Sequence, residues 1–523
     1  MQRALGVAAA IGGAAVAWHY HHLGLTLTHY DARGHLVVAR RIADSITPGW
    51  QQIGAVWLPL PHLLNALPVQ ADWLYRSGAS AVAISVAAFA VATISIGSIV
   101  LMLTGSPLCA VVGAAVFVSN PNVLYLQSTP MTEPLLMALT TSGVALMIRW
   151  CGLTPAGAEL ARPADNLASR RDISATRRDH PETSNDLTAG RASSAPTAGI
   201  GWIFALACLT RYEAWPITAC ALATAGFALC GVTSRRQAWR AVARIGVYPA
   251  LAIAAFTVFS RVVVGRWFVS GDFFVPENKA LDDLSMSADE IAWGVRALSG
   301  TLIVWLGAAG TAALVVMGAA FRRRRHALIA VSLAAAALIP WAAFYKGHPF
   351  RIRYMIPLIA MEAVGTGVVA GMVRRGRLVA CAIVLAAALV ELHPLDANAP
   401  MVVEAQWDRP NRPVRAKVTA CLDGPDSPGK IMASMGSLGH YMQEASAGGY
   451  PIRKFLHEGN GDIWLAALDD PRPFAEWVLI EEKAQGGDVL ARIARNRPAF
   501  LAGYSRVCEG AGLALYRRNP LQR

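Results

Sequence analysis

Long apolar stretches separated by short polar segments dominate this chain and decide what it can fold into. A membrane-spanning helix needs about 20 mainly apolar residues to cross a hydrocarbon core of about 30 Å. About eleven stretches approach this requirement, so the sequence predicts a polytopic α-helical membrane protein. They lie near residues 4–26, 78–103, 107–126, 133–150, 199–212, 215–231, 245–264, 298–319, 327–345, 354–372 and 378–392.

The composition agrees with a membrane protein and excludes two other classes. Of the 523 residues, 54% are hydrophobic and only 15% are charged. A soluble globular protein carries roughly 25% charged residues, so this chain has too little polar surface to cover a water-exposed core. A secreted disulfide scaffold is also excluded, because 8 cysteines are sparse in a chain of this length.

The positive charge predicts an orientation rather than a nucleic-acid partner. The net charge is +13, but most basic residues stand in clusters between apolar stretches. Such clusters mark the cytoplasmic loops of membrane proteins. The N-terminus is then inside and everything after about residue 392 is outside. The clusters are Arg235, Arg236 and Arg240, then Arg322 to Arg325, then Arg374, Arg375 and Arg377, and the polar segment 151–198.

Two stretches leave alternatives. Residues 199–231 have Arg-rich flanks on both sides, so we expect a helical hairpin with a charged tip at 211–216 on the outer side, rather than one long helix. The first stretch contains Ala15-Val16-Ala17, which is compatible with signal-peptide cleavage. We expect a retained span, because cleavage would leave the next loop without a membrane tether at its start.

The chain divides into a transmembrane domain at 1–392 and a smaller domain at 393–523. Within the first, residues 151–198 are poor in aromatic residues and predict a flexible cytoplasmic linker. The second alternates strand-like runs at 430–434, 477–480 and 513–517 with helical periodicity at 488–495, as in a small extracytoplasmic α/β domain. Its only two cysteines, Cys421 and Cys508, are predicted to form a disulfide that joins the first strand region to the last. The alternative is two unpaired thiols.

Two acidic residues stand at the outer edge of predicted spans. Asp31 lies in the run His29-Tyr30-Asp31-Ala32-Arg33-Gly34-His35, where a carboxylate with nearby imidazoles suits a general base. The alternative role is to complement the dipole of an amphipathic helix at 36–42. Glu133 follows Thr132, a suitable N-cap, and precedes Pro134 at the start of a span. A dipole-complementing glutamate is the alternative there.

Two further polar segments are predicted to lie on the same side. In the hairpin tip, Arg211 and Glu213 are two residues apart, and residues two apart on a helix do not face each other, so we expect separate partners. The loop 346–354 is basic on the outer side, against the positive-inside rule, which favours a bound anion such as a phosphate. Its polar members include His348, Arg351, Arg353 and Tyr354.

No motif in the sequence supports a metal or a cofactor. His19, His21 and His22 are close together but lack a Cys or Asp cluster at ligand spacing, so we expect them at the membrane interface. The run Gly436-Ser437-Leu438-Gly439 is a weak phosphate-loop signal and is most often a turn. A divalent metal remains possible without being indicated.

Taken together, these motifs resemble the GT-C superfamily of integral-membrane glycosyltransferases, and most closely its bacterial branch related to protein O-mannosyltransferases. The resemblance covers most of residues 1–392. It is carried by an acidic residue in the first outer loop, by a stretch that ends in Trp57 to His62, and by three later blocks. Those blocks are Thr129 to Pro134, Arg211-Tyr212-Glu213 and Arg351-Ile352-Arg353-Tyr354.

The resemblance implies a polyprenyl-phosphate sugar donor and an acceptor that approaches from the outer face of a bacterial inner membrane. It also implies that Asp31 is the catalytic base and Glu133 a second acid. Many members carry two adjacent acids in the first loop, whereas here Ala32 follows Asp31, which puts a metal-dependent variant in doubt. The substrate-binding residues it implies are His35, Trp57, His62, Arg211, Glu213, His348, Arg351, Arg353 and Tyr354.

The predicted function is therefore inverting transfer of a sugar from a polyprenyl phosphate to an acceptor hydroxyl. Asp31 would remove the acceptor proton, and Arg351 and Arg353 would stabilise the departing phosphate. A transporter or flippase for an anionic or lipid-linked substrate is the alternative, although it should show repeat symmetry and charges near the midplane. A non-catalytic scaffold is a third class. The sequence does not identify the sugar, the carrier or the acceptor.

Overall fold

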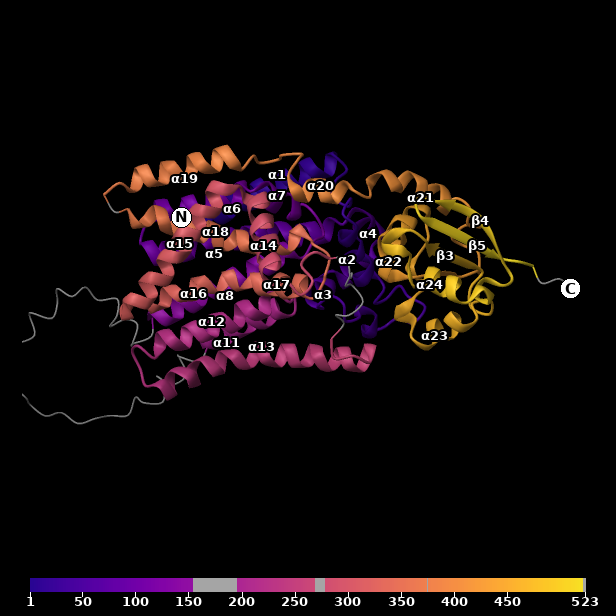
Figure 1. The fold of residues 1–523 in the computed structure, drawn as a ribbon, viewed down its shortest axis with the longest axis horizontal. Coiled ribbons are helices and arrows are strands. Elements are labelled where there is room, and N and C mark those ends of the chain that lie inside the picture. The colour runs from indigo at the N-terminus through magenta and orange to yellow at the C-terminus, as the bar shows by residue number, and fades with distance from the viewer. Residues whose placement is uncertain (154–194, 269–277, 374, 521–523) are drawn as a thin grey trace, which may run out of the picture.

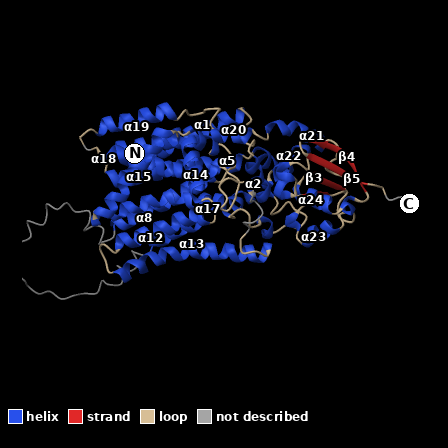
Figure 2. Cartoon of the chain, viewed as in Figure 1, coloured by secondary structure: helices blue, strands red, loops and turns tan. Residues whose placement is uncertain are grey.

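The computed structural model describes residues 1–153, 195–268, 278–373 and 375–520. Figure 1 shows an elongated molecule with a helical bundle at one end and a smaller domain, which contains the C-terminus, at the other. Figure 2 shows strands only in that smaller domain. The predicted linker 151–198 lies largely outside the described residues, as does Arg374.

Helices occupy every predicted span window. Among the described residues, five segments are long and apolar enough to cross a membrane: α5 (Ala79–Thr104), α8 (Glu133–Leu153), α13 (Arg235–Val264), α15 (Thr301–Ala320) and the run Arg322–Tyr345, which ends in α17 (Leu338–Tyr345). The same described ranges contain four shorter apolar helices, α6 (Pro107–Ser119), α11 (Ala195–Cys208), α12 (Ala214–Leu229) and α18 (Leu358–Met372). The first and last windows hold α1 (Gln2–His22) and α19 (Arg377–Glu391).

Two features of the bundle refine the sequence prediction. The hairpin at 199–231 is present, as α11 and α12 joined by a short turn. The window 107–126 is interrupted, because α6 ends at Ser119 and α7 (Pro121–Leu126) begins after Asn120, whose side chain caps it. Small residues allow close helix packing: a Cβ on Gly310 of α15 would lie 1.9 Å from the carbonyl oxygen of Gly365 on α18.

Residues 27–77, which the sequence analysis predicts as the first outer loop and which keep that name below, form a layer between the bundle and the C-terminal domain (Figure 1). It contains α2 (Tyr30–Arg40), η1 (Trp50–Ile53), α3 (Leu60–Ala66), η2 (Pro68–Gln70) and α4 (Asp72–Ser77). The helix α2 begins earlier than the predicted start at residue 36. His29 takes an extended backbone conformation and its side chain accepts a hydrogen bond from the Asp31 N–H, so His29 caps the helix. Asp31 therefore lies inside the first helical turn.

The C-terminal domain is built on a five-stranded sheet of order β2-β1-β3-β5-β4. The strands β2, β1 and β3 are parallel, and β5 and β4 continue the sheet in antiparallel pairing. The helices α22 (Met435–Ala445), α23 (Asp462–Asp469) and α24 (Val489–Asn496) complete it. The strands are β1 (Ile431–Ala433), β2 (Phe455–Leu456), β3 (Trp477–Glu481), β4 (Tyr504–Gly510) and β5 (Leu513–Arg518).

This domain shares a hydrophobic core with the first outer loop. Leu36 and Val37 of α2 pack in one buried cluster with Tyr441 of α22 and Phe455 of β2. The linking helix α20 (Pro400–Gln406) packs into the core of the bundle, and α21 (Arg412–Thr419) follows it. The boundary predicted at residue 392 therefore marks a change in the sequence pattern. In the structure, the two parts on either side of it pack against each other.

The predicted disulfide between Cys421 and Cys508 is confirmed, with Cα atoms 6.5 Å apart. Its placement differs from the prediction. Cys421 follows α21 rather than belonging to a strand region, and Cys508 lies in β4, the penultimate strand. The bond therefore ties the end of α21 to an edge strand of the sheet.

Candidate active site

The helix α2 brings Asp31 to the end of the bundle that faces the C-terminal domain (Figure 1). The carboxylate is 7% exposed and forms an ion pair with the guanidinium of Arg353, which lies in the 3-10 turn η6 (Ile352–Met355). Burial alone raises the pKa of Asp31, but the charge of Arg353 outweighs it and holds that pKa below its usual range. The same pair holds the pKa of Arg353 well above its ordinary value despite burial. Asp31 is therefore an ionised carboxylate at neutral pH.

A second buried cluster lies at the start of α8. Glu133 is fully buried and accepts a hydrogen bond of 2.8 Å from Nη1 of Arg211, which also donates to the Thr132 hydroxyl at 3.1 Å. The Nη2 of Arg211 donates to Glu213 at 2.7 Å. Burial lowers the pKa of Arg211, but Glu133 and then Glu213 outweigh it, so that pKa lies above its ordinary value.

The direct pair between Arg211 and Glu213 shows that the expectation of separate partners was wrong. That expectation assumed helical geometry at the hairpin tip. The helix α11 ends at Cys208 and α12 begins only at Ala214, so the tip is a turn. In this turn the two side chains point the same way, and one guanidinium bridges two carboxylates.

Three predicted residues of the first outer loop form an aromatic group beside Asp31. The Nδ1 of His35 lies 3.0 Å from the Nε2 of His62, and the ring centroids of His35 and Trp57 are 4.2 Å apart. Burial lowers the pKa of His35, and it lowers the pKa of His62 to about 3, so both imidazoles are neutral at pH 7. A cavity of about 20 Å³, room for roughly one water, lies between His35 and Thr132.

The basic loop contributes two different arginines. Arg353 is engaged by Asp31, whereas the half-buried Arg351 has no carboxylate within 4 Å among the residues that the structure describes. The ring of Tyr354 lies 5.5 Å from the Arg353 guanidinium, and its hydroxyl lies 3.4 Å from the Nε2 of His348. Burial lowers the pKa of His348. Arg351 is thus the arginine of this loop that is open to an added anion.

One contact at the site was not foreseen from the sequence. The Nε2 of His29 lies 3.6 Å from the Oε1 of Glu404 on α20, and both residues are buried. The Nδ1 of His29 accepts from the Asp31 N–H at 3.1 Å, so a neutral imidazole carries its proton on Nε2, toward Glu404. Glu404 lies in the predicted second domain, and no spacing in the sequence connects it to the first outer loop.

These groups act on one another at short range. The charge of Glu133 contributes to the high pKa of Arg353, and the charge of Arg353 acts on Arg211 in the opposite direction. The structure therefore brings together all four polar segments selected from the sequence, at one end of the bundle. Within the described ranges, no group of three or more His, Cys, Asp or Glu side chains could hold a metal ion.

Comparison with solved structures supports the fold of the family that the motifs resemble. No family model and no curated protein matches the sequence. ArnT from Cupriavidus metallidurans, solved with undecaprenyl phosphate, is similar in structure with a TM-score of 0.54, 13% identity and coverage of 96% of this chain and 97% of that one.

The oligosaccharyltransferase of Archaeoglobus fulgidus is similar in two structures. Its complex with Zn and sulfate gives a TM-score of 0.50 and 12% identity, covering 99% of this chain and 74% of that one. The form tethered to an acceptor peptide with an NVT sequon gives 0.51 and 11%, with coverage of 100% and 75%. ArnT and this oligosaccharyltransferase are GT-C glycosyltransferases, so the fold of this chain is GT-C-like, as the motifs predicted.

Proposed function

We propose that this protein transfers a sugar from a polyprenyl-phosphate donor to an acceptor hydroxyl at the outer face of a bacterial inner membrane. One observation carries the proposal: a buried carboxylate, Asp31, is paired with a buried arginine, Arg353, beside a second acidic cluster at one end of a GT-C-like bundle. The undecaprenyl phosphate bound to ArnT and the peptide tethered to the oligosaccharyltransferase support a lipid-linked donor and a separate acceptor.

Because of the ion pair, Asp31 can act as a base only when the donor is bound. While Arg353 neutralises it, Asp31 is a weak base. A donor phosphate is a better partner for a guanidinium, because its oxygens match the planar fork. When Arg353 turns to the phosphate, burial raises the pKa of Asp31, and the carboxylate can accept the proton of an acceptor hydroxyl.

The reaction then proceeds by direct displacement. The acceptor oxygen forms a bond to the anomeric carbon on the side opposite the leaving group, its proton passes to Asp31, and the bond from that carbon to the phosphate oxygen breaks. Polyprenyl phosphate leaves with the electron pair. Arg351, which has no carboxylate partner among the described residues, and Arg353 stabilise its charge. The configuration of the sugar is inverted.

The second cluster orients the substrates. The Oε2 of Glu133 is buried and has no hydrogen-bond partner within the described structure, so it is available to a sugar or acceptor hydroxyl. Arg211 holds the other oxygen and prevents the carboxylate from turning away. The rings of Trp57, His35 and His62 offer one apolar wall, which suits the face of a sugar ring.

The predicted orientation in the membrane completes the proposal. The N-terminus lies in the cytoplasm, the chain crosses about eleven times, and the C-terminal domain is extracytoplasmic, in accord with the charged loops and a disulfide in that domain. Both charged clusters lie at one end of the bundle, which favours an enzyme over a transporter that binds its substrate near the midplane.

The test uses the donor that the cell itself makes. A strain without this protein should accumulate an unused polyprenyl-phosphate sugar, whose mass names the sugar. Wild type and Asp289→Asn, an exposed acid on α14 (Leu284–Ser299), should clear it. Asp31→Asn should leave it in place while reaching the membrane in equal amount, because loss of a general base costs roughly 10²–10⁴-fold in rate. Clearance by Asp31→Asn at the wild-type rate would refute the assignment.

A further inference from the structure

A polar pocket of about 360 Å³ lies where the C-terminal domain meets the first outer loop, away from the candidate active site. It is lined on one side by Arg40 and Asp72 and on the other by two segments of the C-terminal domain that contain Lys430 and Lys454. Its volume falls within the range of small-molecule sites, about 300–1,000 Å³. Arg40 ends α2, nine residues and about 14 Å of helix from Asp31.

The sheet register places two lysines side by side at this pocket. Lys430 immediately precedes β1 and Lys454 immediately precedes β2, and the parallel pairing aligns Ile431 with Phe455. The two lysines therefore occupy neighbouring positions on adjacent strands, about 4.8 Å apart along the hydrogen-bonding direction. Like charges placed opposite each other in a sheet are unfavourable.

Neither lysine contacts a carboxylate among the described residues. Lys454 is only 7% exposed, and its Nζ donates to the Ser427 hydroxyl at 3.4 Å and to the Gly429 carbonyl at 3.2 Å. The Nζ of Lys430 donates to the Arg453 carbonyl at 3.1 Å. In the described part of the chain, no carboxylate oxygen lies within 4 Å of either ammonium. Burial and then Lys430 lower the pKa of Lys454, and the charges of Asp426 and Glu476 oppose them only in part. Buried lysines without a carboxylate are rare, which indicates a missing anion.

The arginines of the pocket contrast with the lysines. Arg40 donates to Asp44 at 3.1 Å and to Asp72 at 2.7 Å, and Arg453 donates to Asp44 at 3.0 Å. Their charges are therefore already compensated, and only the lysine pair is left to bind an anion. The remaining lining supplies carboxylates such as Asp426, the Ser427 hydroxyl and proline rings, which suit the hydroxyls and carbon faces of a sugar.

We propose that this pocket binds an acidic sugar, whose carboxylate or phosphate lies between Lys430 and Lys454. Because the pocket is formed by both the first outer loop and the C-terminal domain, a saccharide bound there is held against the far end of the helix that carries Asp31. The proposal concerns binding alone and does not depend on the transfer reaction.

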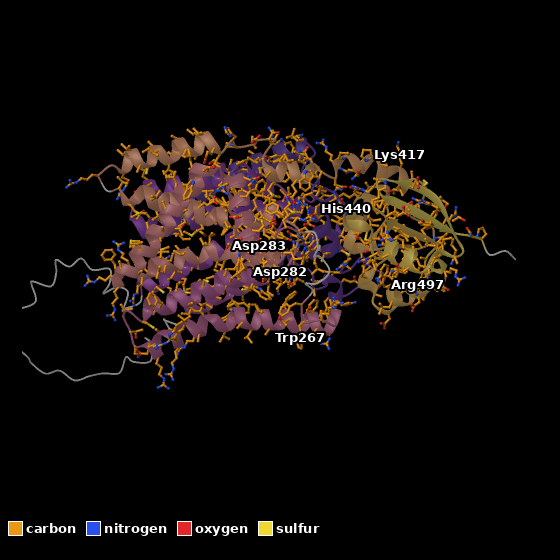
Figure 3. The ribbon with its side chains drawn as sticks, viewed as in Figure 1. Trp267, Asp282, Asp283, Lys417, His440 and Arg497 are labelled. Atoms are coloured by element: carbon orange, nitrogen blue, oxygen red, sulfur yellow. A yellow bond between two sulfur atoms is a disulfide. The ribbon has the colours of Figure 1, made fainter. Side chains whose placement is uncertain are left out.

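The experiment is calorimetric titration of the purified full-length protein in detergent with D-glucuronate, with inorganic phosphate and with D-glucose as the neutral match. Glucuronate should bind at least about tenfold more tightly than glucose, because a charge-assisted hydrogen bond is worth more than a neutral one. Lys430→Gln and Lys454→Gln should each weaken binding about tenfold, by the same reasoning. Lys417→Gln, an exposed lysine of the same domain (Figure 3), should not change it.

Each outcome decides the proposal. Binding of phosphate but not glucuronate, lost in the lysine variants, supports the anion site and identifies the acidic group as a phosphate. Equal binding of glucose and glucuronate, or no measurable binding of either anion, overturns it. Binding that is unchanged in Lys430→Gln overturns it as well, and this variant decides the question if Lys454→Gln fails to fold, because Lys430 is only half-buried. A loss of transfer activity with binding intact would bear on the proposed function alone.

Discussion

The helix α2 carries two buried charges of opposite sign, two residues apart, and their surroundings differ. Asp31 faces Arg353 and the bundle, whereas Arg33 faces Glu444 on α22 of the C-terminal domain. Successive helical residues are about 100° apart, so positions two apart point to nearly opposite sides. One short helix therefore connects the candidate active site with the junction between the two domains.

At the junction, Arg415 is the centre of a network in which each charged side chain has a partner of opposite charge. Arg415 on α21 donates to both oxygens of Glu444, each at 2.7 Å, and to both oxygens of Asp408, at 2.7 and 2.6 Å. Arg33 adds a further contact to Glu444. Figure 3 shows His440 on the bundle side of this domain, and its Nε2 lies 4.0 Å from Asp408. Such a network fixes one arrangement of the two domains and leaves none of its own members free for a ligand.

At the candidate active site, several groups lack partners. The Oε2 of Glu133, the Nε of Arg353, the Nε2 of His29 and the Oε1 of Glu404 are buried without a hydrogen bond in the described structure. Buried polar atoms are normally satisfied, and exceptions mark functional sites or bound molecules. The contrast indicates that the active-site groups are arranged to bind a substrate and that the junction network holds the two domains together. Three experiments test this contrast.

Arg415→Met should destabilise the docking of the C-terminal domain. The change leaves the half-buried carboxylates of Asp408 and Glu444 without the arginine that bridges them, and Arg33 contacts only Glu444. Breaking a buried ion pair in this way costs about 3–5 kcal/mol. Thermal unfolding and protease resistance of the domain should both fall, while transfer activity at low temperature persists.

The control is Arg472→Met, which breaks an exposed pair with Asp470. We expect it to leave unfolding and protease resistance unchanged, because exposed ion pairs contribute little. If Arg415→Met abolished transfer without loosening the domain, the junction network would belong to the catalytic machinery and the contrast would fail.

The sequence predicted the helices well because their apolar windows report burial in lipid directly. Two strands were missed for local reasons. The strand β2 has only two residues, Phe455 and Leu456, and β4 is largely exposed, so its polar alternation resembles a loop. The disulfide could be predicted because only two cysteines occur in the domain.

The sequence analysis selected the residues of the candidate site one by one, but it did not predict which of them form pairs. Asp31, Glu133, Arg211 and Arg353 were selected individually, because charged residues near span ends are rare. Their partners depend on helix packing between segments far apart in the chain, which local spacing does not contain. Glu404 could not be selected at all, since an acidic residue outside the predicted spans carries no signal in the sequence.

Arg353→Met should move the acid limb of the pH profile. In the wild type, Arg353 keeps the pKa of Asp31 below its usual range of about 3.9. Without that charge, burial raises the pKa, so the base becomes protonated at higher pH and activity is lost earlier as the pH falls. The measurement is kcat/KM against pH, which reports the free enzyme.

Arg353→Lys is the matched variant, because it keeps the positive charge but loses the planar guanidinium group. Its acid limb should stay near the wild-type position, although its rate is lower. An identical acid limb in wild type and Arg353→Met would show that the charge of Arg353 does not act on the catalytic base.

The smallest effect is expected for Glu404→Gln, which removes the charge opposite His29. If the charge of Glu404, 3.6 Å from the Nε2 of His29, orients the imidazole that caps α2 at Asp31, kcat should fall about tenfold with the donor KM unchanged, because residues in contact couple by about 0.5–3 kcal/mol. Glu482→Gln, a partly exposed acid of the sheet domain, should have no effect.

A double-mutant cycle separates this positioning role from simple packing. His29→Asn retains a residue that caps helices well, so the fold is preserved, but it breaks the contact with Glu404. We expect it to lower kcat by the same factor as Glu404→Gln. The double variant should be no worse than either single one, since both remove one and the same interaction. Additive losses would mean that the two residues act separately, and Glu404 would then have no part in placing Asp31.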